Sequence, residues 1–323
     1  MLIEVDVNTV KRNIREARRV TGGRVSGVVK AAAYGHGLGL IRRIENDLDT
    51  LAVSNIEEAF ALRDLGVRAP IHVLGSVLNS NKVAKAIKAG IILTITDPAT
   101  YKIINSGVAA EVKINTGMNR LGLTAEEFKM IRPNINLRGI FTHFADGADI
   151  DFCNEQLAEF EKAEKLCPKG VIRHCCATNY KVLPKKFYKD GIRLGLGMYG
   201  NAMKAGGRVV QINRVRAGDR VGYGNNIVSY NTRTATLDIG YGDGIPRSLS
   251  NGKGKIDICG YLYHIVGTVC MDMVMVDIGN ADIALGEKAY YIRNNINSVA
   301  DAANTIPYEI MTALNLRATY KYT

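Results

Sequence analysis

The chain has 323 residues, of which 47% are hydrophobic and 23% charged, and its formal net charge is +11. This is ordinary globular composition, and the length predicts one barrel-sized domain together with a second domain. The Lys and Arg residues are scattered along the chain and accompany no nucleic-acid-binding motif. The charge therefore indicates solubility and attraction for anionic small molecules, and we expect no nucleic-acid partner.

Cysteine usage and the first residues indicate the compartment. The six cysteines include no Cys-x-x-Cys pair, and Cys175 and Cys176 are adjacent. This pattern favours a reducing compartment and argues against a zinc site, so we expect no bound metal. The first residues, MLIEVDVNTVKRN, carry acids where a signal peptide needs an apolar core, and no apolar run reaches about 18 residues. We therefore expect a cytoplasmic protein without membrane contact.

In chain order, the pattern predicts a strand at Leu2–Val7, followed by a basic helix that runs to about Val20. Short apolar runs then alternate with helical patterns. The runs predicted as strands are Val25–Ala32, Thr50–Ser54, Ile71–Gly75, Ile92–Thr96, Ala110–Asn115, Arg138–Phe144, Val171–Cys176 and Gly191–Leu194. The helical patterns between them include Glu57–Leu65, Lys82–Lys88, a helix opened by the capping box of Thr124 and Glu127, and Glu155–Leu166.

This alternation predicts an α/β fold with an N-terminal (β/α)8 TIM-like barrel. A doubly wound open sheet is the alternative, but it would not need so many evenly spaced strand and helix units. In a barrel of this kind, chemistry takes place where the strands end and the loops to the helices begin.

After Gly200 the chain changes to β-rich runs separated by tight turns. The runs predicted as strands are Val209–Val215, Val221–Gly224, Thr232–Ile239, Lys255–Tyr263, Ile265–Val269, Met273–Ile278 and Ala289–Ile292, with helical patterns at Val299–Asn304 and Glu309–Leu314. We therefore predict a barrel over residues 8–207 and a C-terminal mostly-β domain over residues 208–323, which the N-terminal strand 1–7 joins.

A single lysine stands out in the first barrel strand. Lys30 follows Val28 and Val29 and precedes a Gly-His-Gly loop. A lysine in such a strand is costly unless its charge is paired or its amine is chemically engaged, and desolvation would make the amine a nucleophile. The alternative is a strand-end lysine whose amine reaches solvent. The predicted position near the end of a barrel strand favours a functional role.

Six stretches in order carry a resemblance to a known family. They are VVKAAAYGHG (28–37), KINTGMNRLG (113–122), THFA (142–145), RLGLGMYG (193–200), GYGDG (240–244) and CMD (270–272). This arrangement resembles alanine racemase, a fold-type III enzyme that uses pyridoxal 5'-phosphate (PLP). The likeness extends from the first strand to Pro307–Glu309 and spans both predicted domains.

The resemblance implies two catalytic residues. Lys30 matches the lysine that binds PLP covalently and carries the Cα proton on one face of the substrate. Racemisation needs proton exchange on the opposite face too, and Tyr241 matches the tyrosine that does this from the other subunit of a head-to-tail homodimer. Taken alone, Tyr241 would be a turn tyrosine between glycines. An ordinary tyrosine is a poor base at neutral pH, and His143 and Arg193 match the hydrogen-bonded groups that stabilise its phenolate.

The resemblance also places Arg193 opposite the pyridine nitrogen of PLP. A cation there disfavours protonation of that nitrogen, which weakens the electron sink and favours racemisation over side reactions. Decarboxylases of the same fold type use a glutamate in this role. His174 matches a histidine behind the arginine and is expected to support it. Read without the family, His143 would be a buried core histidine and Arg193 a salt-bridge partner at the barrel rim.

The remaining matches concern the cofactor phosphate and the substrate. Tyr34, Tyr308 and Thr178 match phosphate-contacting hydroxyls, and the N–H groups of Gly195 and Leu196 complete that cradle. Arg120 matches the arginine that contacts the cofactor ring oxygen and the substrate carboxylate. Met271 and Asp272 match substrate-site residues of the partner subunit. Lys113 matches a lysine that is often carbamylated in the family.

Several positions depart from the family pattern. The family usually has Asn, Asp, Asn, Pro and Arg where this chain has Ala32, Asn115, Ala177, Leu194 and Thr268. None of these is a proton-transfer group. The resemblance thus implies a racemase that interconverts L- and D-alanine and supplies D-alanine for peptidoglycan. The alternatives are a racemase for serine or another small amino acid, and a non-catalytic PLP-homeostasis protein, although such proteins are single barrels without a β domain.

Overall fold

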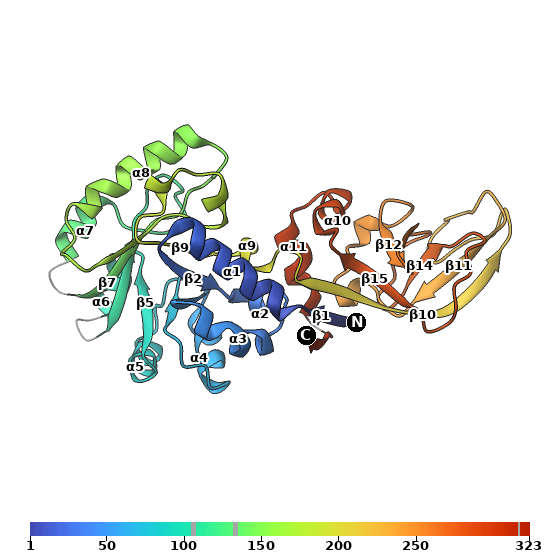
Figure 1. The fold of residues 1–323 in the computed structure, drawn as a ribbon, viewed down its shortest axis with the longest axis horizontal. Coiled ribbons are helices and arrows are strands. Elements are labelled where there is room, and N and C mark those ends of the chain that lie inside the picture. The colour runs from blue at the N-terminus through green and yellow to red at the C-terminus, as the bar shows by residue number, and fades with distance from the viewer. Residues whose placement is uncertain (105–107, 132–134, 316) are drawn as a thin grey trace. The chain divides into compact units, whose positions relative to one another are not determined.

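A computed structural model describes residues 1–104, 108–131, 135–315 and 317–323 (Figure 1). The chain packs as two compact units. The barrel unit comprises Val10–Ala31 and Ile41–Tyr199, and the β unit comprises Met1–Thr9, Ala32–Leu40 and Gly200–Thr323. We predicted a division at 207/208 with strand 1–7 in the second domain; the C-terminal part of the β unit begins at Gly200, and the unit takes in Ala32–Leu40 as well as Met1–Thr9.

The barrel unit contains a closed barrel of parallel strands, which confirms the predicted TIM-like fold and excludes an open sheet. Each strand pairs with the next along the chain, and β9 pairs with β2 to close the ring. The strands are β2 (Arg24–Val28), β3 (Thr50–Val53), β4 (Ile71–Val73), β5 (Ile91–Ile95), β6 (Ala109–Lys113), β7 (Asn136–Phe141), β8 (Ile172–His174) and β9 (Gly191–Leu194). Every predicted barrel strand is therefore present.

Helices cover the outside of the barrel, which explains why its strands are nearly continuous apolar runs (Figure 1). The helices of this part of the chain are α1 (Val7–Thr21), α3 (Leu38–Ile44), α4 (Ile56–Asp64), α5 (Ser80–Lys88), α6 (Pro98–Ile103), α7 (Ala125–Ile131), α8 (Ile150–Glu164) and α9 (Leu196–Tyr199), with short 3-10 turns η1 (Glu45–Asp47), η3 (Thr178–Lys181) and η4 (Lys185–Phe187). Side chains cap several of them: Asn55 accepts from the Glu58 N–H, and Asp149 accepts from the Phe152 N–H. The predicted capping box of Thr124 and Glu127 is also formed.

The strand predicted at Val25–Ala32 is too long. β2 ends at Val28, and the chain then forms the short helix α2 (Lys30–Tyr34). Four consecutive residues of this helix, Ala31–Tyr34, have φ values between 50° and 56°, so α2 is left-handed. Alanine is a good right-handed helix former and carries no sequence signal for this conformation, which costs an L-residue roughly 1–2 kcal/mol.

The β unit is built on an eight-stranded sheet, as the predicted mostly-β domain requires. The N-terminal strand pairs antiparallel with β10 and parallel with β16. The strands are β1 (Leu2–Val5), β10 (Met203–Val215), β11 (Thr232–Leu237), β12 (Lys255–Ile258), β13 (Tyr261–His264), β14 (Val274–Asp277), β15 (Lys288–Arg293) and β16 (Thr319–Tyr322). The helical elements are α10 (Ile296–Ala303), α11 (Pro307–Thr312), η5 (Tyr241–Asp243), η6 (Arg247–Leu249) and η7 (Ala313–Asn315).

Three strand predictions in this unit were wrong. Neither Val221–Gly224 nor Ile265–Val269 is a strand, because the chain turns within both segments at glycines of positive φ. The isolated bridges at these segments are at Arg220, just before the first segment, and at Ile265. The run Lys255–Tyr263 is a hairpin of β12 and β13, turned by Cys259 and Gly260, which also have positive φ. Among the residues that the structure describes, no helix is both long and apolar enough to cross a membrane.

Candidate active site

The carboxyl ends of the barrel strands bring five of the predicted site residues to one end of the barrel unit. Lys30 follows β2 by two residues, and His143 follows β7 by two residues. The other three lie within the strands, near or at their ends: Lys113 in β6, His174 in β8 and Arg193 in β9. Side chains at this end of a TIM-like barrel are the ones that carry chemistry in enzymes of this fold.

Lys30 lies in a desolvated and electropositive environment. Burial lowers the pKa of its amine, the neighbouring charge of Arg120 lowers it further, and Glu58 opposes the shift. A lower pKa raises the neutral fraction of the amine, which is the form that attacks a carbonyl group. The environment of Lys30 is therefore that of a nucleophilic lysine.

Glu58, which the sequence analysis did not identify, fixes the backbone beside Lys30. Its carboxylate accepts a hydrogen bond from the Ala31 N–H at 2.7 Å and another from the Ser54 N–H at 2.7 Å. The Val29 N–H meanwhile donates to the Ala52 carbonyl at 2.8 Å. These bonds attach the chain on one side of Lys30 to β3 and on the other side to α4, so the lysine is held at a defined position.

Arg193 is 3% exposed, and its guanidinium is held by a set of protein acceptors. Nη1 donates to His174 Nδ1 at 2.6 Å and to the His174 carbonyl at 2.9 Å. Nη2 donates to the carbonyls of Thr142 and Cys175 at 2.5 and 3.2 Å, and to His143 Nδ1 at 3.3 Å. The structure thus brings His143, His174 and Arg193 together.

Because a guanidinium can only donate hydrogen bonds, both histidines must accept through Nδ1 and carry their proton on Nε2. Burial, together with the charge of Arg193, lowers the pKa of His143 to about 3. His143 therefore stays neutral at physiological pH, as a group that accepts from Arg193 must.

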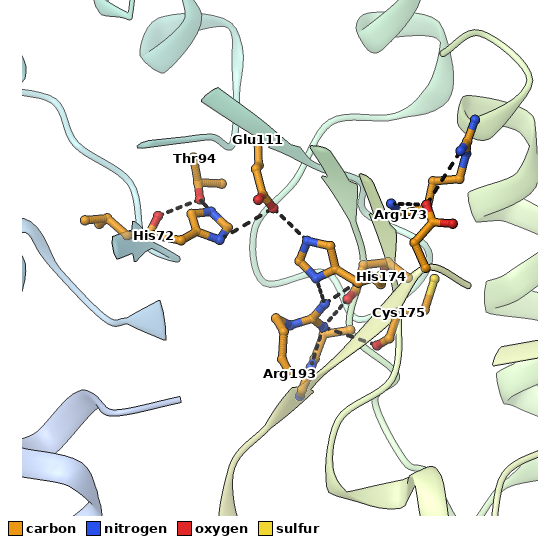
Figure 2. Close-up of polar contacts among 11 residues, drawn as sticks. His72, Thr94, Glu111, Arg173, His174, Cys175 and Arg193 are labelled. Atoms are coloured by element: carbon orange, nitrogen blue, oxygen red, sulfur yellow. Dashed lines mark hydrogen bonds and ion pairs between the residues drawn. The ribbon is translucent and has the colours of Figure 1, made fainter. Parts of the chain in front are cut away.

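The hydrogen bonds of Arg193 continue into the barrel, as Figure 2 shows. His174 Nε2 lies 2.6 Å from Glu111 Oε2, and His72 Nδ1 lies 3.5 Å from the same oxygen. Neither Glu111 nor His72 was identified from the sequence. The available signal was a charged residue inside the predicted buried strand Ala110–Asn115, but the spatial partner of such a residue cannot be read from one strand.

Lys113 adds a further buried cation. Burial, together with the charges of Arg120, Arg193 and Lys30, lowers the pKa of its amine to about 8. Lys30, Lys113, Arg120 and Arg193 are therefore close enough to repel one another, and such a cluster is stabilised by an anionic ligand.

A folded-back loop after β6 carries Arg120. The Asn115 N–H donates to the Leu123 carbonyl at 2.9 Å, and the Leu123 N–H donates to the Lys113 carbonyl at 2.8 Å. The Asn115 side chain accepts from the Asn119 N–H at 3.0 Å. Asn115, one of the departures from the family pattern, therefore still closes the loop that contains Arg120.

The predicted phosphate cradle of the barrel unit lies at the start of α9. Thr178 Oγ1 accepts a hydrogen bond from the Gly197 N–H at 3.1 Å. A Cβ at position 197 would lie 3.0 Å from the Thr178 methyl carbon and 3.1 Å from a Leu194 methyl carbon, so glycine allows this close approach. Gly195 and Leu196 directly precede this contact, and Gly195 accepts from the Met198 N–H.

In the β unit, Tyr34 and Tyr308 lie side by side. Their ring centroids are 5.8 Å apart and the rings are tilted by 51°. Burial raises the pKa of both hydroxyls, so both remain protonated and can donate hydrogen bonds at neutral pH. The predicted pair of phosphate-contacting tyrosines is thus brought together within one unit.

Tyr241 lies on the turn η5 and its side chain is 43% exposed. The Tyr241 N–H donates to the Cys270 carbonyl at 2.9 Å, and the Gly242 N–H donates to the Met271 carbonyl at 2.8 Å. A Cβ at Gly240 would lie 2.3 Å from the Cys270 carbonyl oxygen, so only glycine permits this contact. The predicted base and the predicted substrate residues Met271 and Asp272 are therefore on two connected loops.

Arg317, which the sequence analysis missed, holds the same two loops. Nη1 donates to Asp272 Oδ1 at 2.7 Å, and Nη2 donates to Asp243 Oδ2 at 3.1 Å. The guanidinium thus joins the turn of Tyr241 to the loop of Met271 and Asp272. Arg317 lies outside the matched motifs, so no sequence signal pointed to it.

A TIM-like barrel with a desolvated lysine and a buried, histidine-held arginine at the ends of its strands belongs to the class of barrel enzymes. Comparisons with known proteins give the family. Residues 5–203 match the model of the alanine racemase N-terminal domain, and residues 202–322 match the model of the alanine racemase C-terminal domain. The chain therefore belongs to the alanine racemase family and is an isomerase.

Individual relatives agree over the whole chain. Alanine racemase 2 of Caldanaerobacter subterraneus subsp. tengcongensis is 32% identical, over 98% of this chain and 92% of that protein. Alanine racemase 2 of Bacillus subtilis is 31% identical, again over 98% of this chain and 92% of that protein. The crystal structure of alanine racemase from Bartonella henselae with covalently bound pyridoxal phosphate has a TM-score of 0.90 at 27% identity, and the match covers 100% of this chain and 99% of that one.

Proposed function

We propose that this protein is a PLP-dependent racemase that interconverts L- and D-alanine by a two-base mechanism. The observation that carries the proposal is the desolvated Lys30 amine close to three cations, the buried Lys113 and Arg193 and the exposed Arg120. These residues suit the group: an amine of lowered pKa can bind the PLP aldehyde, and the cations favour an anionic cofactor. The paired donors Tyr34 and Tyr308 suit its phosphate.

When bound, PLP draws electrons away from the substrate Cα and thereby lets the Cα proton leave. The chain itself has to move that proton. The Lys30 amine can accept the proton at Nζ and return it, and its lowered pKa favours this role because an acid–base catalyst works better as its pKa moves towards the operating pH.

Tyr241 supplies the base for the opposite face. Its exposure of 43%, together with 53% for Met271, shows that the β unit presents these side chains outward. This supports a head-to-tail homodimer in which Tyr241, Met271 and Asp272 of one copy serve the Lys30 of the other. In that arrangement the hydroxyl oxygen of Tyr241 holds or releases the second proton.

Arg193 sets the reaction type in this proposal. Its guanidinium would face the cofactor ring nitrogen and, being a cation, disfavour protonation there. Its fixed orientation, through His174 Nδ1 at 2.6 Å and three backbone carbonyls, supports this role. His143, which accepts from the same guanidinium, then belongs to the chain that stabilises the Tyr241 phenolate.

Substrate binding falls to Arg120 and to the loop of Met271. The Arg120 guanidinium would hold the substrate carboxylate, with the Met271 N–H as a second donor. The Asp272 carboxylate is already paired with Arg317 at 2.7 Å. Asp272 thus shapes the loop without presenting an unpaired negative charge to an anionic substrate group.

We also propose that Lys113 is carbamylated. A neutral amine is the form that reacts with carbon dioxide, and the Lys113 pKa of about 8 provides that form at neutral pH. The resulting negative charge would offset the three cations that lower this pKa: Arg120, Arg193 and Lys30. Mass determination of the intact protein under a carbon dioxide atmosphere tests this point.

In a bacterial cytoplasm the product would be D-alanine for peptidoglycan. The decisive experiment is to follow the loss of optical activity with L-alanine and with L-serine, using protein whose visible cofactor absorbance has been recorded. We expect cofactor absorbance and preferential turnover of L-alanine. Absence of that absorbance would refute the proposal. Preferential turnover of L-serine would show that serine, and not alanine, is the substrate.

A further inference from the structure

Glu111 is a buried carboxylate in the interior of the barrel. It is 5% exposed and sits on β6 between two histidine rings, from His72 on β4 and His174 on β8 (Figure 2). The neighbouring strand makes room for it: a Cβ at Gly139 of β7 would lie 3.0 Å from Glu111 Cδ. In the part of the barrel unit that the structure describes, the only other buried acid is Glu45, which bonds the Arg68 and Ala69 N–H groups.

The positions of the protons follow from the contacts. Arg193 donates to His174 Nδ1, so the His174 proton lies on Nε2, and this N–H donates to Glu111 Oε2 at 2.6 Å. Carboxylate, imidazole and guanidinium thus form one directional chain. A hydrogen bond from an imidazole N–H to a carboxylate makes the opposite ring nitrogen a better acceptor, which strengthens the bond from Arg193.

The other side of Glu111 is also constrained. The Thr94 hydroxyl donates to the Val73 carbonyl at 2.6 Å, so His72 Nε2 must donate to Thr94 at 2.8 Å, and His72 Nδ1 faces the carboxylate. The Phe141 ring stacks on His174 with centroids 5.2 Å apart and meets His72 edge-on at 5.4 Å. A cavity of about 30 Å³ touches His72, Glu111 and His174 and has room for a bridging water molecule.

Glu111 supplies the negative charge that stabilises the charged form of the buried Arg193. Burial lowers the pKa of Arg193, and the groups that oppose this shift are Cys175, Glu111 and Cys176. Burial raises the pKa of both cysteine thiols, that of Cys176 to about 12, so at neutral pH they carry no charge. Burial raises the pKa of Glu111, but the hydrogen bond from His174 and the charge of Arg193 hold it below its ordinary value. The Glu111 carboxylate therefore remains as the anion that balances the guanidinium.

We propose that Glu111 is a positioning residue for Arg193: through His174 it supplies the negative charge that keeps the buried guanidinium charged and fixed in orientation. The part of this inference that concerns the cofactor rests on the proposed function, because Arg193 is the group expected to face the PLP ring. The hydrogen bonds that link Glu111 to His174 and His174 to Arg193 do not depend on the cofactor.

The test compares Glu111→Gln with Glu111→Asp in the holoenzyme. Gln keeps an acceptor for His174 and removes the charge, whereas Asp keeps the charge. Because loss of a nearby anion destabilises cationic forms, we expect Glu111→Gln to lower the pH at which the cofactor absorbance titrates by roughly half to one unit. We also expect kcat to fall about 10–100-fold with little change in KM, and Glu111→Asp to restore part of both.

Glu45→Gln is the matched control, since it removes the other buried carboxylate of the barrel unit without touching a histidine. A Glu111→Gln protein with the titration and kcat of the Glu45→Gln control would overturn the inference. Wild-type protein that binds no cofactor would instead overturn the proposed function, and the two failures are therefore distinguishable.

A measurement on the cofactor-free wild type keeps the inference testable if Glu111→Gln does not fold. In protein labelled with ¹⁵N-histidine, His174 should show a neutral ring with its proton on Nε2, and because burial lowers its pKa it should stay neutral below the pH at which an ordinary histidine titrates. A His174 resonance that titrates near the ordinary histidine pKa of about 6.5, or a ring protonated on Nδ1, would contradict the chain of contacts and with it the role of Glu111.

Discussion

The barrel unit and the β unit hold their site residues in opposite ways. In the barrel unit, Arg193 is 3% exposed, and its contacts with His143 and His174 come from side chains of the same unit. In the β unit, Tyr241 and Met271 are 43% and 53% exposed, although the backbone below them is tightly bonded. The barrel unit therefore holds its site residues buried and hydrogen-bonded, whereas the β unit exposes the side chains of its site residues on loops whose backbone is hydrogen-bonded.

The difference suits the proposed two-base reaction, in which each unit would supply one base. Proton transfer requires a desolvated lysine of lowered pKa, which a barrel interior provides. The second base has to approach from the opposite face of the substrate, so it is best carried on a surface that docks. The outward residues therefore need rigid loops, and the contacts of Arg317 provide that rigidity in the β unit.

The largest predicted effects concern Lys30 and Tyr241. Loss of either base should lower racemisation by about 10²–10⁴-fold, so Lys30→Ala and Tyr241→Phe should each be nearly inactive. An equal mixture of the two variants, unfolded and refolded together, tests whether the site is shared between two copies. About half of the dimers then contain one chain of each variant, and each such dimer has one intact site of two. About a quarter of the wild-type activity should therefore return. Activity is measured as loss of optical rotation.

The Tyr241→Phe protein should still show cofactor absorbance, because Lys30 is unchanged. It should lose exchange of the Cα proton from one enantiomer of alanine much more than from the other. A mixture that recovers no activity would place both bases in one chain, and equal loss of exchange from both enantiomers would contradict the simple two-base scheme.

The next largest effect concerns Arg317, which joins the two site loops of the β unit. Arg317→Ala removes the bonds to Asp272 and Asp243 that join the two loops. We expect kcat/KM for alanine to fall about 10–100-fold with cofactor absorbance retained, because misplacing reacting groups by about 1 Å has effects of this size. Steady-state kinetics checks this. Arg293→Ala, which removes an ion pair to Asp257 in the same unit, should have no such effect.

A smaller effect concerns stability and pH in the barrel unit. The pKa of Lys113 is lowered from 10.5 to about 8, so between these values the unfolded chain binds more protons than the folded one. The free energy of unfolding of cofactor-free protein should therefore rise with pH in this window, by up to about 3 kcal/mol from this residue. Below about pH 8 both states are protonated and the unfavourable burial of the charge is fully present.

Urea unfolding at a series of pH values, with carbon dioxide excluded, measures this slope. Lys113→Met should remove it, whereas Lys85→Met, a change at an exposed lysine of the same unit, should leave it intact. An unchanged slope in Lys113→Met protein would show that Lys113 is not the group responsible.

The smallest effect concerns the core of the β unit. The buried Tyr291 hydroxyl on β15 has no hydrogen-bond partner among the residues that the structure describes. Tyr291→Phe removes an unsatisfied polar group and should raise the free energy of unfolding by about 1 kcal/mol. Tyr290→Phe is the matched control, because the Tyr290 hydroxyl donates to Glu4 at 3.3 Å and its loss should not stabilise. Chemical denaturation of the two variants decides the point.

Much of the fold was predictable because short apolar runs mark barrel strands: all of those from Val25 to Leu194 were located, with errors of a few residues at their ends. The β unit was predicted less well. Gly222 and Gly224 turn a run that reads as a strand, and β16 is a short edge strand with the alternating pattern Thr-Tyr-Lys-Tyr but little apolar content.

The residues of the candidate site could be predicted only where they match the motifs or residues shared with the family. The matched residues Lys30, His143, His174 and Arg193 are placed by strands that the pattern reveals. Glu58 and Glu111 are placed by hydrogen bonds between distant segments, and a single sequence contains no record of such partners. The same holds for Arg317, which acts on loops far from it along the chain.

The left-handed helix α2 has a consequence that concerns chirality. Positive φ is the natural conformation of D-amino acids, so Ala31, Ala32 and Ala33 are L-alanines held in the conformation that their mirror image would adopt freely. The chain passes from the barrel unit to the β unit between Ala31 and Ala32. The positions of Lys30 and Tyr34, at the two ends of this turn, therefore depend on a left-handed backbone conformation that the surrounding fold must impose. If that fold were lost, the backbone would relax to the right-handed or extended conformations that L-residues prefer.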